Sequence, residues 1–148
     1  MYCTFFGHRE APLSLKDEVK KAVEDLFLKC NIKDFCVGNN GNFDYIVQSV
    51  LQNLIDEGLE IDYIIYTSRI DELALNKHQE KTIFPEGLET TPKRFAIVRR
   101  NDLLIKKSNY LICYVNHIAS NSYKLRKKAE KYGLIIIDIN TQTNSNFM

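Results

Sequence analysis

The polar residues best suited to chemistry near the start of the chain are Gly7, His8 and Arg9, which directly follow a short apolar run. An imidazole titrates near neutral pH and can act as an acid, a base or a phosphate donor. A guanidinium can bind phosphate or carboxylate through two parallel hydrogen bonds. His8 could instead bond the backbone where the strand ends. We favour a functional role, because these three residue types together contribute little to packing.

A second candidate is a turn between the apolar residues 35–37 and an amphipathic segment that ends near residue 57; it reads Gly38, Asn39, Asn40, Gly41. Glycine and asparagine tolerate positive φ. A strand that enters a helix through such a turn directs backbone N–H groups and the positive end of the helix dipole toward one point. The turn is therefore a candidate phosphate loop, although many similar turns in α/β proteins only reverse the chain.

Asp44 follows this turn, in the first turn of the helix that we expect there. Its carboxylate could bind a ribose hydroxyl or the edge of a base. It is equally well explained as an acidic residue placed favourably on the helix dipole.

A third candidate lies within a predicted helix over residues 93–107, which contains the run Arg99, Arg100, Asn101, Asp102. Neighbouring residues of a helix point roughly 100° apart. At most two of the four can therefore face one pocket. We take Arg100 and Asn101 as the functional pair, on the resemblance described below, and expect Arg99 and Asp102 to face solvent.

Composition excludes several classes of protein. The chain has 148 residues, is 45% hydrophobic and has a net charge of +1, which fits one globular domain without a global field for nucleic acid or membranes. Its start does not resemble a signal peptide, its apolar runs are too short to span a membrane, and its four cysteines form no C-x-x-C pair. We expect a cytoplasmic protein with reduced thiols, no metal site and no cofactor.

Alternating apolar strands and amphipathic helices define the fold class. We expect strands at residues 2–6, 35–37, 61–67, 109–115 and 134–139. Between them we expect helices that begin at a Ser14 cap, after Gly41, at Thr91-Pro92 and at Ser122. This order is typical of an α/β domain over residues 1–148, with a mainly parallel five-stranded sheet between two helix layers.

A parallel sheet of this kind binds ligands beyond the carboxyl ends of its strands. Chain order alone then brings residues 7–10, 38–42, 67–70 and 116–121, with residue 140, around one crevice. Residues 68–91 break the pattern, and we interpret them as an insertion or lid, with a short helix near residues 71–79, or as a solvated loop. Residues 140–148 are expected to form a flexible tail.

Several segments together resemble one known group of proteins. CTFFGHRE, FCVGNNGNFD, FPEGLETTPKRFAIVRRNDLLIKKSNYLICYV and AEKYGLIIIDI are similar to the SLOG superfamily, named for the Smf and Lonely Guy proteins. Within it they most resemble the small bacterial YpsA-like branch, often left as a domain of unknown function. The resemblance covers residues 3–139. It implies a Rossmann-like, three-layer α/β/α fold that binds nucleotides or nucleotide-derived ligands at the strand ends.

The resemblance also implies roles for individual residues. The first ligand loop would contain Gly7, His8 and Arg9, and the second Gly38, Asn39, Gly41 and Asp44. Arg100 and Asn101, followed by Leu104 and Ser108, resemble a segment of the Lonely Guy enzymes. There the arginine belongs to the active site of a phosphoribohydrolase, which cleaves the base from a nucleoside monophosphate.

The chain departs from this family in one loop. Where relatives carry a glycine-rich phosphate loop, it has Ser120, Asn121 and Ser122, which could still bond a phosphate at a helix N-terminus. Where the hydrolases carry their catalytic glutamate, the nearby positions are Lys124, Leu125 and Arg126.

These observations favour a domain that binds a nucleotide-type small molecule as a sensor or accessory module. The first alternative is an N-glycosidic hydrolase that acts on nucleoside monophosphates, with acid/base groups from His8, Asp44, Glu86 or Arg100. The second is a single-stranded nucleic-acid or protein-interaction module that uses the basic last helix, whose charges are otherwise a solvated face. We expect no membrane partner, and the sequence leaves open whether the chain forms a homo-oligomer.

Overall fold

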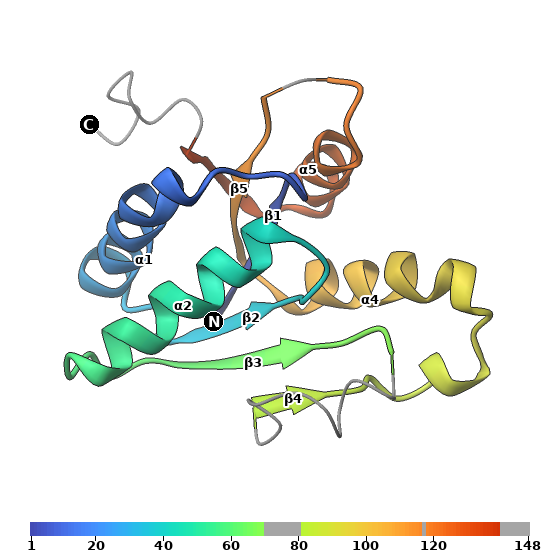
Figure 1. Ribbon diagram of the computed structural model, residues 1–148, viewed down its shortest axis with the longest axis horizontal. Helices are drawn as coiled ribbons and strands as arrows, with labels where there is room; N and C mark the ends of the chain where they lie inside the picture. Colours follow the sequence, from blue (N-terminus) through green and yellow to red (C-terminus); the bar gives the residue numbers. More distant parts are fainter. Residues whose placement is uncertain (70–80, 117, 140–148) are drawn as a thin grey trace.

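The computed structural model describes residues 1–69, 81–116 and 118–139. Its strands are β1 (Tyr2–Gly7), β2 (Asp34–Val37), β3 (Asp62–Tyr66), β4 (Thr82–Ile83), β5 (Tyr110–Tyr114) and β6 (Ile135–Asp138). Its α-helices are α1 (Lys16–Cys30), α2 (Asn42–Asp56), α4 (Lys93–Lys107) and α5 (Asn121–Tyr132), with short 3₁₀ turns at Leu13–Leu15 and Leu88–Thr90. The predicted α/β fold, with a parallel sheet between helix layers, is confirmed (Figure 1).

The sheet has six strands among the described residues, rather than the five that we predicted, in the order β4-β3-β2-β1-β5-β6. The extra strand, β4, lies in the segment interpreted as an insertion, and it pairs with Ile65 and Tyr66 of β3. Two residues at a sheet edge are too few to show an alternating pattern, so this strand could not be predicted from its own residues. The expected helix near residues 71–79 and the expected tail at 140–148 lie outside the described residues.

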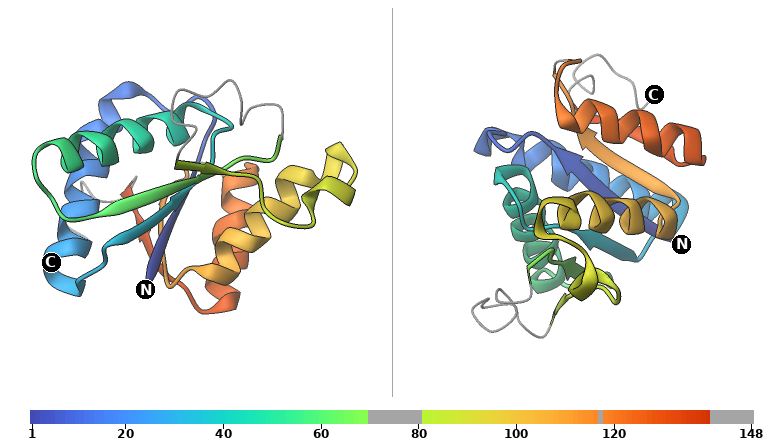
Figure 2. Two further views of the ribbon diagram at one scale, coloured as in Figure 1. Left: turned by 90° about the horizontal axis from the view of Figure 1, so that it is seen from below. Right: turned by 90° about the vertical axis from the view of Figure 1, so that its right-hand side faces the viewer.

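Two helix layers cover the sheet (Figure 2). Helices α1 and α2 pack on one face through residues such as Val23 and Val47, which join one apolar cluster. Helices α4 and α5 pack on the other face through residues such as Leu104 and Ala129, in a second cluster. Alternate residues of β1 pack on opposite faces of the sheet, since Phe5 belongs to the first cluster and Phe6 to the second. This is the period of two that a strand covered on both faces requires.

The central strand β1 marks the point where strand order reverses. Thr4 of β1 pairs with Cys36 of β2 on one side and with Leu111 of β5 on the other. The connections that leave β1 and β5 therefore run to opposite faces of the sheet. This opens a gap at the carboxyl edge, where ligands of such sheets bind.

Helix ends follow local chemistry, with one correction. Gly58 and Gly133 end α2 and α5 with φ of 101° and 102°, the left-handed conformation that favours glycine. Ser14 is not the cap of α1, contrary to our prediction. It lies inside a 3₁₀ turn in which the Leu15 N–H donates to the Pro12 carbonyl at 3.1 Å, and the helix begins only at Lys16.

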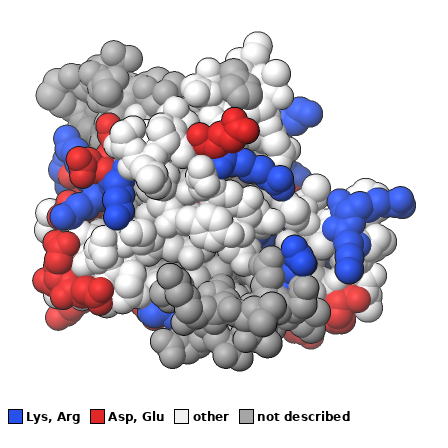
Figure 3. All heavy atoms as spheres, viewed as in Figure 1, with Lys and Arg blue, Asp and Glu red and all other residues white. Residues whose placement is uncertain are grey.

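The two helix layers differ sharply in charge. Helix α4 carries six basic residues and one acidic residue, and α5 carries five and one. Helix α1 is balanced at four of each, and α2 has two acidic residues and no basic one. Figure 3 shows basic side chains over the right-hand end, where α4 begins, and acidic ones at the lower left, where α2 ends. The chain's net charge of +1 thus conceals a basic layer opposite a weakly acidic one.

No helix of the described residues combines the length and apolar character of a membrane span.

Candidate ligand-binding site

A cavity of about 380 Å³ lies at the carboxyl edge of the sheet, at the reversal of strand order. Loops after β1 and β2, one face of α4 and the first turns of α2 and α5 enclose it. The predicted ligand residues that line it are Gly7, His8, Arg9, Gly38, Gly41, Asp44, Arg100, Asn101, Ser120, Asn121 and Ser122. Segments far apart in sequence therefore meet in one hollow.

Two predicted site residues, Asn39 and Glu86, lie elsewhere, and so do residues 67–69, 116, 118 and 119 of the predicted crevice. Asn39 does not line the cavity; it is buried, and its carbonyl accepts a hydrogen bond from the Tyr45 hydroxyl at 3.0 Å. Glu86, the carboxylate assigned to a lid, is exposed and also lies outside the lining. The side chain of the β2–α2 turn that faces the cavity is instead Asn40. The resemblance implies Asn39 at this position, but turn residues do not alternate predictably as strand residues do.

The glycines of the site permit close packing, which differs from the role that we predicted for them. The described glycines with positive φ are Gly58, Gly87 and Gly133, none of them at the cavity. A Cβ on Gly7 would lie 2.3 Å from the Phe43 ring, and a Cβ on Gly41 would lie 2.8 Å from the Cα of Arg9. The β1 loop can therefore pack directly on the start of α2 only because these side chains are missing.

Arg100 is the most constrained charged group of the site. Only 3% of it is exposed, and a Cβ on Gly38 would lie 2.9 Å from its Nη1 atom. Each of its three nitrogens donates to a protein acceptor. Nε and Nη2 donate to Asn101 Oδ1 at 3.2 and 2.8 Å, and Nη1 donates to Asn40 Oδ1 and, at 3.3 Å, to the Tyr66 carbonyl. The guanidinium is thus fixed in the wall, and its hydrogen bonds join α4 to β3 and to the β2–α2 turn.

Asp44 supports the same turn from α2. Its Oδ2 accepts a hydrogen bond from the Asn40 N–H at 2.8 Å. Burial raises the pKa of the Asp44 carboxyl, while the positive charges of Arg100 and Arg9 and the Asn40 N–H act against that rise. A carboxyl with a raised pKa at a cavity is a feature of many functional sites, and also of structural networks.

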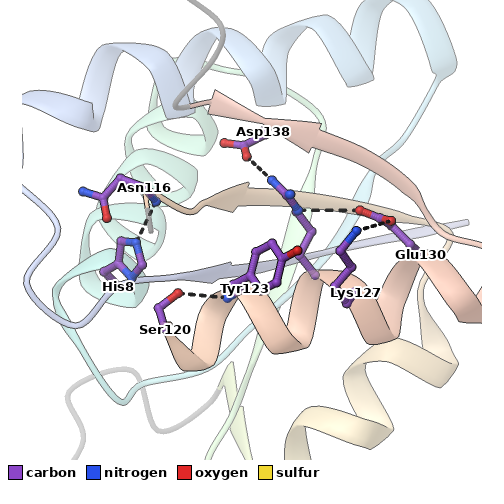
Figure 4. A network of polar contacts seen from close by, with 8 residues as sticks. His8, Asn116, Ser120, Tyr123, Lys127, Glu130 and Asp138 are labelled. Atoms are coloured by element: carbon purple, nitrogen blue, oxygen red, sulfur yellow. Dashed lines mark hydrogen bonds and ion pairs between the residues drawn. The ribbon is translucent and has the colours of Figure 1, made fainter. Parts of the chain in front are cut away.

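The β1 loop is tied to both neighbouring loops. His8 Nε2 accepts a hydrogen bond from the Asn116 N–H at 2.9 Å (Figure 4). The His8 ring also stands edge-on to Tyr114. His8 therefore does bond the backbone, as the alternative interpretation proposed, while it also lines the cavity. The Arg9 carbonyl accepts the Asn42 N–H at 2.9 Å, which occupies one of the first amides of α2. The Arg9 side chain is exposed, and no described carboxylate forms an ion pair with it.

The start of α5 forms the opposite wall. Ser120 is its N-cap, and Ser120 Oγ accepts the Tyr123 N–H at 3.1 Å. The first turn contains no acidic residue, and its leading amides have no partner within the helix, as in any helix. An ion pair of 2.5 Å between Arg126 and Asp138 joins α5 to β6 behind this wall (Figure 4).

Sequence reasoning missed the apolar part of the lining, and it placed Glu10 at the crevice without assigning it a role. Ile97 and Leu104 lie on the same face of α4 as the Arg100–Asn101 pair, at spacings of three and four residues. That spacing was visible in the sequence and could have identified them. Phe5, Phe6 and Leu125 complete the apolar lining.

The described residues contain no group of His, Cys, Asp and Glu side chains arranged to hold a metal ion. No family model matches the chain, and no curated protein matches it.

Proposed function

We propose that the protein binds a nucleotide or nucleotide-derived small molecule in this cavity and acts as a sensor or accessory module. The observation that carries the proposal is the meeting of Arg9, the buried Arg100 and the acid-free first turn of α5 at the reversal of strand order. Positive side chains and a helix N-terminus favour an anionic group such as a phosphate. The resemblance to SLOG proteins agrees with this assignment.

The size and lining of the cavity suit such a ligand. Its volume of about 380 Å³ lies within the range of small-molecule sites, roughly 300–1,000 Å³. Apolar side chains of α4 and β1, including Ile97, Leu104 and Phe6, can pack against a flat base. The polar loops at the rim can hold the sugar and phosphate.

Calorimetric titration with nucleoside monophosphates and ADP-ribose tests the proposal. Arg9→Ala should weaken binding of phosphorylated compounds about tenfold, the effect of losing a charge-assisted hydrogen bond. Arg99→Ala is the matched control: it removes a charge from an exposed residue outside the cavity lining and should leave binding unchanged. If no compound of the panel produces heat or raises the melting temperature, the proposed function is wrong.

The enzyme alternative has one specific observation in its favour. Burial raises the pKa of Asp44, which lines the cavity, and a protonated carboxyl is what a general acid for glycosidic cleavage requires. The same carboxylate already bonds the Asn40 N–H. Incubation of the protein with nucleoside monophosphates should release free base if this alternative holds, and Asp44→Asn should abolish the release. Substrate that stays intact at high protein concentration would rule the reaction out.

A further inference from the structure

Asn101 is oriented by its neighbour on α4. Its Oδ1 accepts two hydrogen bonds from Arg100, at 3.2 Å from Nε and 2.8 Å from Nη2. A flipped amide would point its NH₂ group at these two N–H donors, which would repel it. The interaction with Arg100 therefore fixes the orientation of the amide.

This orientation leaves only hydrogen-bond donors for a ligand. Asn101 is 4% exposed and lines the cavity between Ile97 and Leu104. Within the described part of the chain, no acceptor bonds its Nδ2. A free asparagine amide can both donate and accept, as when it pairs with adenine through both of its atoms. Here the accepting atom is already occupied.

We infer that Asn101 selects bases that present a carbonyl oxygen, and that Arg100 is the positioning residue that enforces this choice. The inference rests on the proposed function, because it assigns a base to the apolar wall beside Asn101. A keto group, as in hypoxanthine, guanine or uracil, accepts a hydrogen bond from Nδ2. An exocyclic amino group at the same place, as in adenine or cytosine, would set a donor against a donor.

Two pairs of nucleotides that carry identical phosphates isolate this effect. We expect the wild-type protein to bind inosine monophosphate about tenfold more tightly than adenosine monophosphate, and uridine monophosphate about tenfold more tightly than cytidine monophosphate, by calorimetry. Asn101→Asp should reverse both preferences. One carboxylate oxygen would still pair with Arg100, and the other would accept from an amino group. The added negative charge affects both members of a pair alike, so the ratio is free of its influence.

Arg100→Lys tests the positioning role. A lysine keeps the positive charge but cannot hold the amide with two N–H groups in a fixed plane. The ratio of the affinity for the keto nucleotide to the affinity for the amino nucleotide should therefore fall toward one in each pair. Arg99→Lys, at the exposed neighbouring residue, should keep the wild-type ratio.

The outcomes separate this inference from the proposed function. Binding of both members of each pair with equal affinity, or a preference for the amino bases, overturns the inference and leaves nucleotide binding intact. If the Arg100→Lys variant keeps the wild-type ratio of affinities, Arg100 does not position Asn101. If the wild-type protein binds no nucleotide, the proposed function fails and the inference fails with it. The wild-type ratio needs no variant, so a variant that does not fold cannot block the test.

Discussion

The N-terminal ends of α2 and α5 both border the cavity, but they differ in the groups that contact their first turns. Both α2 and α5 follow a parallel strand and begin at the carboxyl edge of the sheet. At the start of α2, the Arg9 carbonyl takes the Asn42 N–H, and the Asp44 carboxylate bonds the Asn40 N–H. The start of α5 has only its Ser120 cap and no acidic residue in its first turn.

A helix N-terminus at a switch point is therefore not by itself an anion site. In α2, the Arg9 carbonyl takes one of the leading amides, and Asp44 places an acidic side chain in the first turn. In α5, that positive end still faces the cavity. We therefore expect the start of α2 to respond to mutation mainly through stability, and the start of α5 mainly through binding.

The largest effect should come from Gly7→Ala, at the packing contact beneath the start of α2. The new Cβ would lie 2.3 Å from the Phe43 ring, and overpacking of this kind costs about 2 kcal/mol of unfolding free energy. Urea denaturation measures the loss.

A second variant checks the cause of that loss. In a Phe43→Ala background the crowding atoms Cγ, Cδ1 and Cδ2 are absent, so Gly7→Ala should destabilise the protein much less. Equal losses in the two backgrounds would show that crowding against Phe43 is not the reason.

At the start of α5, two variants of Ser120 distinguish an effect on stability from an effect on ligand binding. Ser120→Ala removes the cap and should lower stability by about 1 kcal/mol. Ser120→Asp preserves the cap, so its melting temperature should stay near that of the wild type. Its carboxylate would nevertheless repel an anion at this wall, and calorimetry should show weaker nucleotide binding. Wild-type affinity in Ser120→Asp would place the anionic group elsewhere.

The smallest effect should come from Asp44→Asn, and it should depend on pH. Burial raises the pKa of Asp44 in the folded protein above that of the unfolded chain. The contribution of this group to stability is complete below the ordinary aspartate pKa of 3.8 and is lost as the pH rises through the folded value. Thermal melts should therefore show Asp44→Asn slightly more stable than the wild type at pH 7, with the difference vanishing in acid. A variant that is less stable at pH 7 would mean that the attraction of the Asp44 carboxylate to the charges of Arg100 and Arg9 outweighs burial.

Most of the fold was predictable because long periodic segments carry it. The amphipathic pattern of α2 predicts a helix, and the apolar run of β3 predicts a strand. The order of strands and helices along the chain predicts a parallel sheet and the edge of that sheet where the loops meet. The failures are local. Ser14 looked like a cap, but a 3₁₀ turn at Pro12 delays the start of α1. Strand β4 is defined by pairing with β3 and not by its own two residues.

The candidate site was predictable in its loops and less so in its side chains. The 100° step of a helix limited the run at residues 99–102 to a single pair, and the structure places Arg100 and Asn101 at the cavity. Sequence could not show that Arg100 would direct its nitrogens into the protein, since that depends on Asn40 and Tyr66 from distant segments. The glycines of the loops were predicted for their tolerance of positive φ, whereas in the structure they permit close approach between loops, which has no local signature.

The unequal charge of the two helix layers makes the molecule electrically asymmetric, although the chain as a whole is almost neutral, with an isoelectric point of about 7.6. An approaching anion should be drawn preferentially to the side formed by α4 and α5, which borders the cavity. The same asymmetry should retain the protein on a cation-exchange column near its isoelectric point, where a uniformly charged protein would pass through.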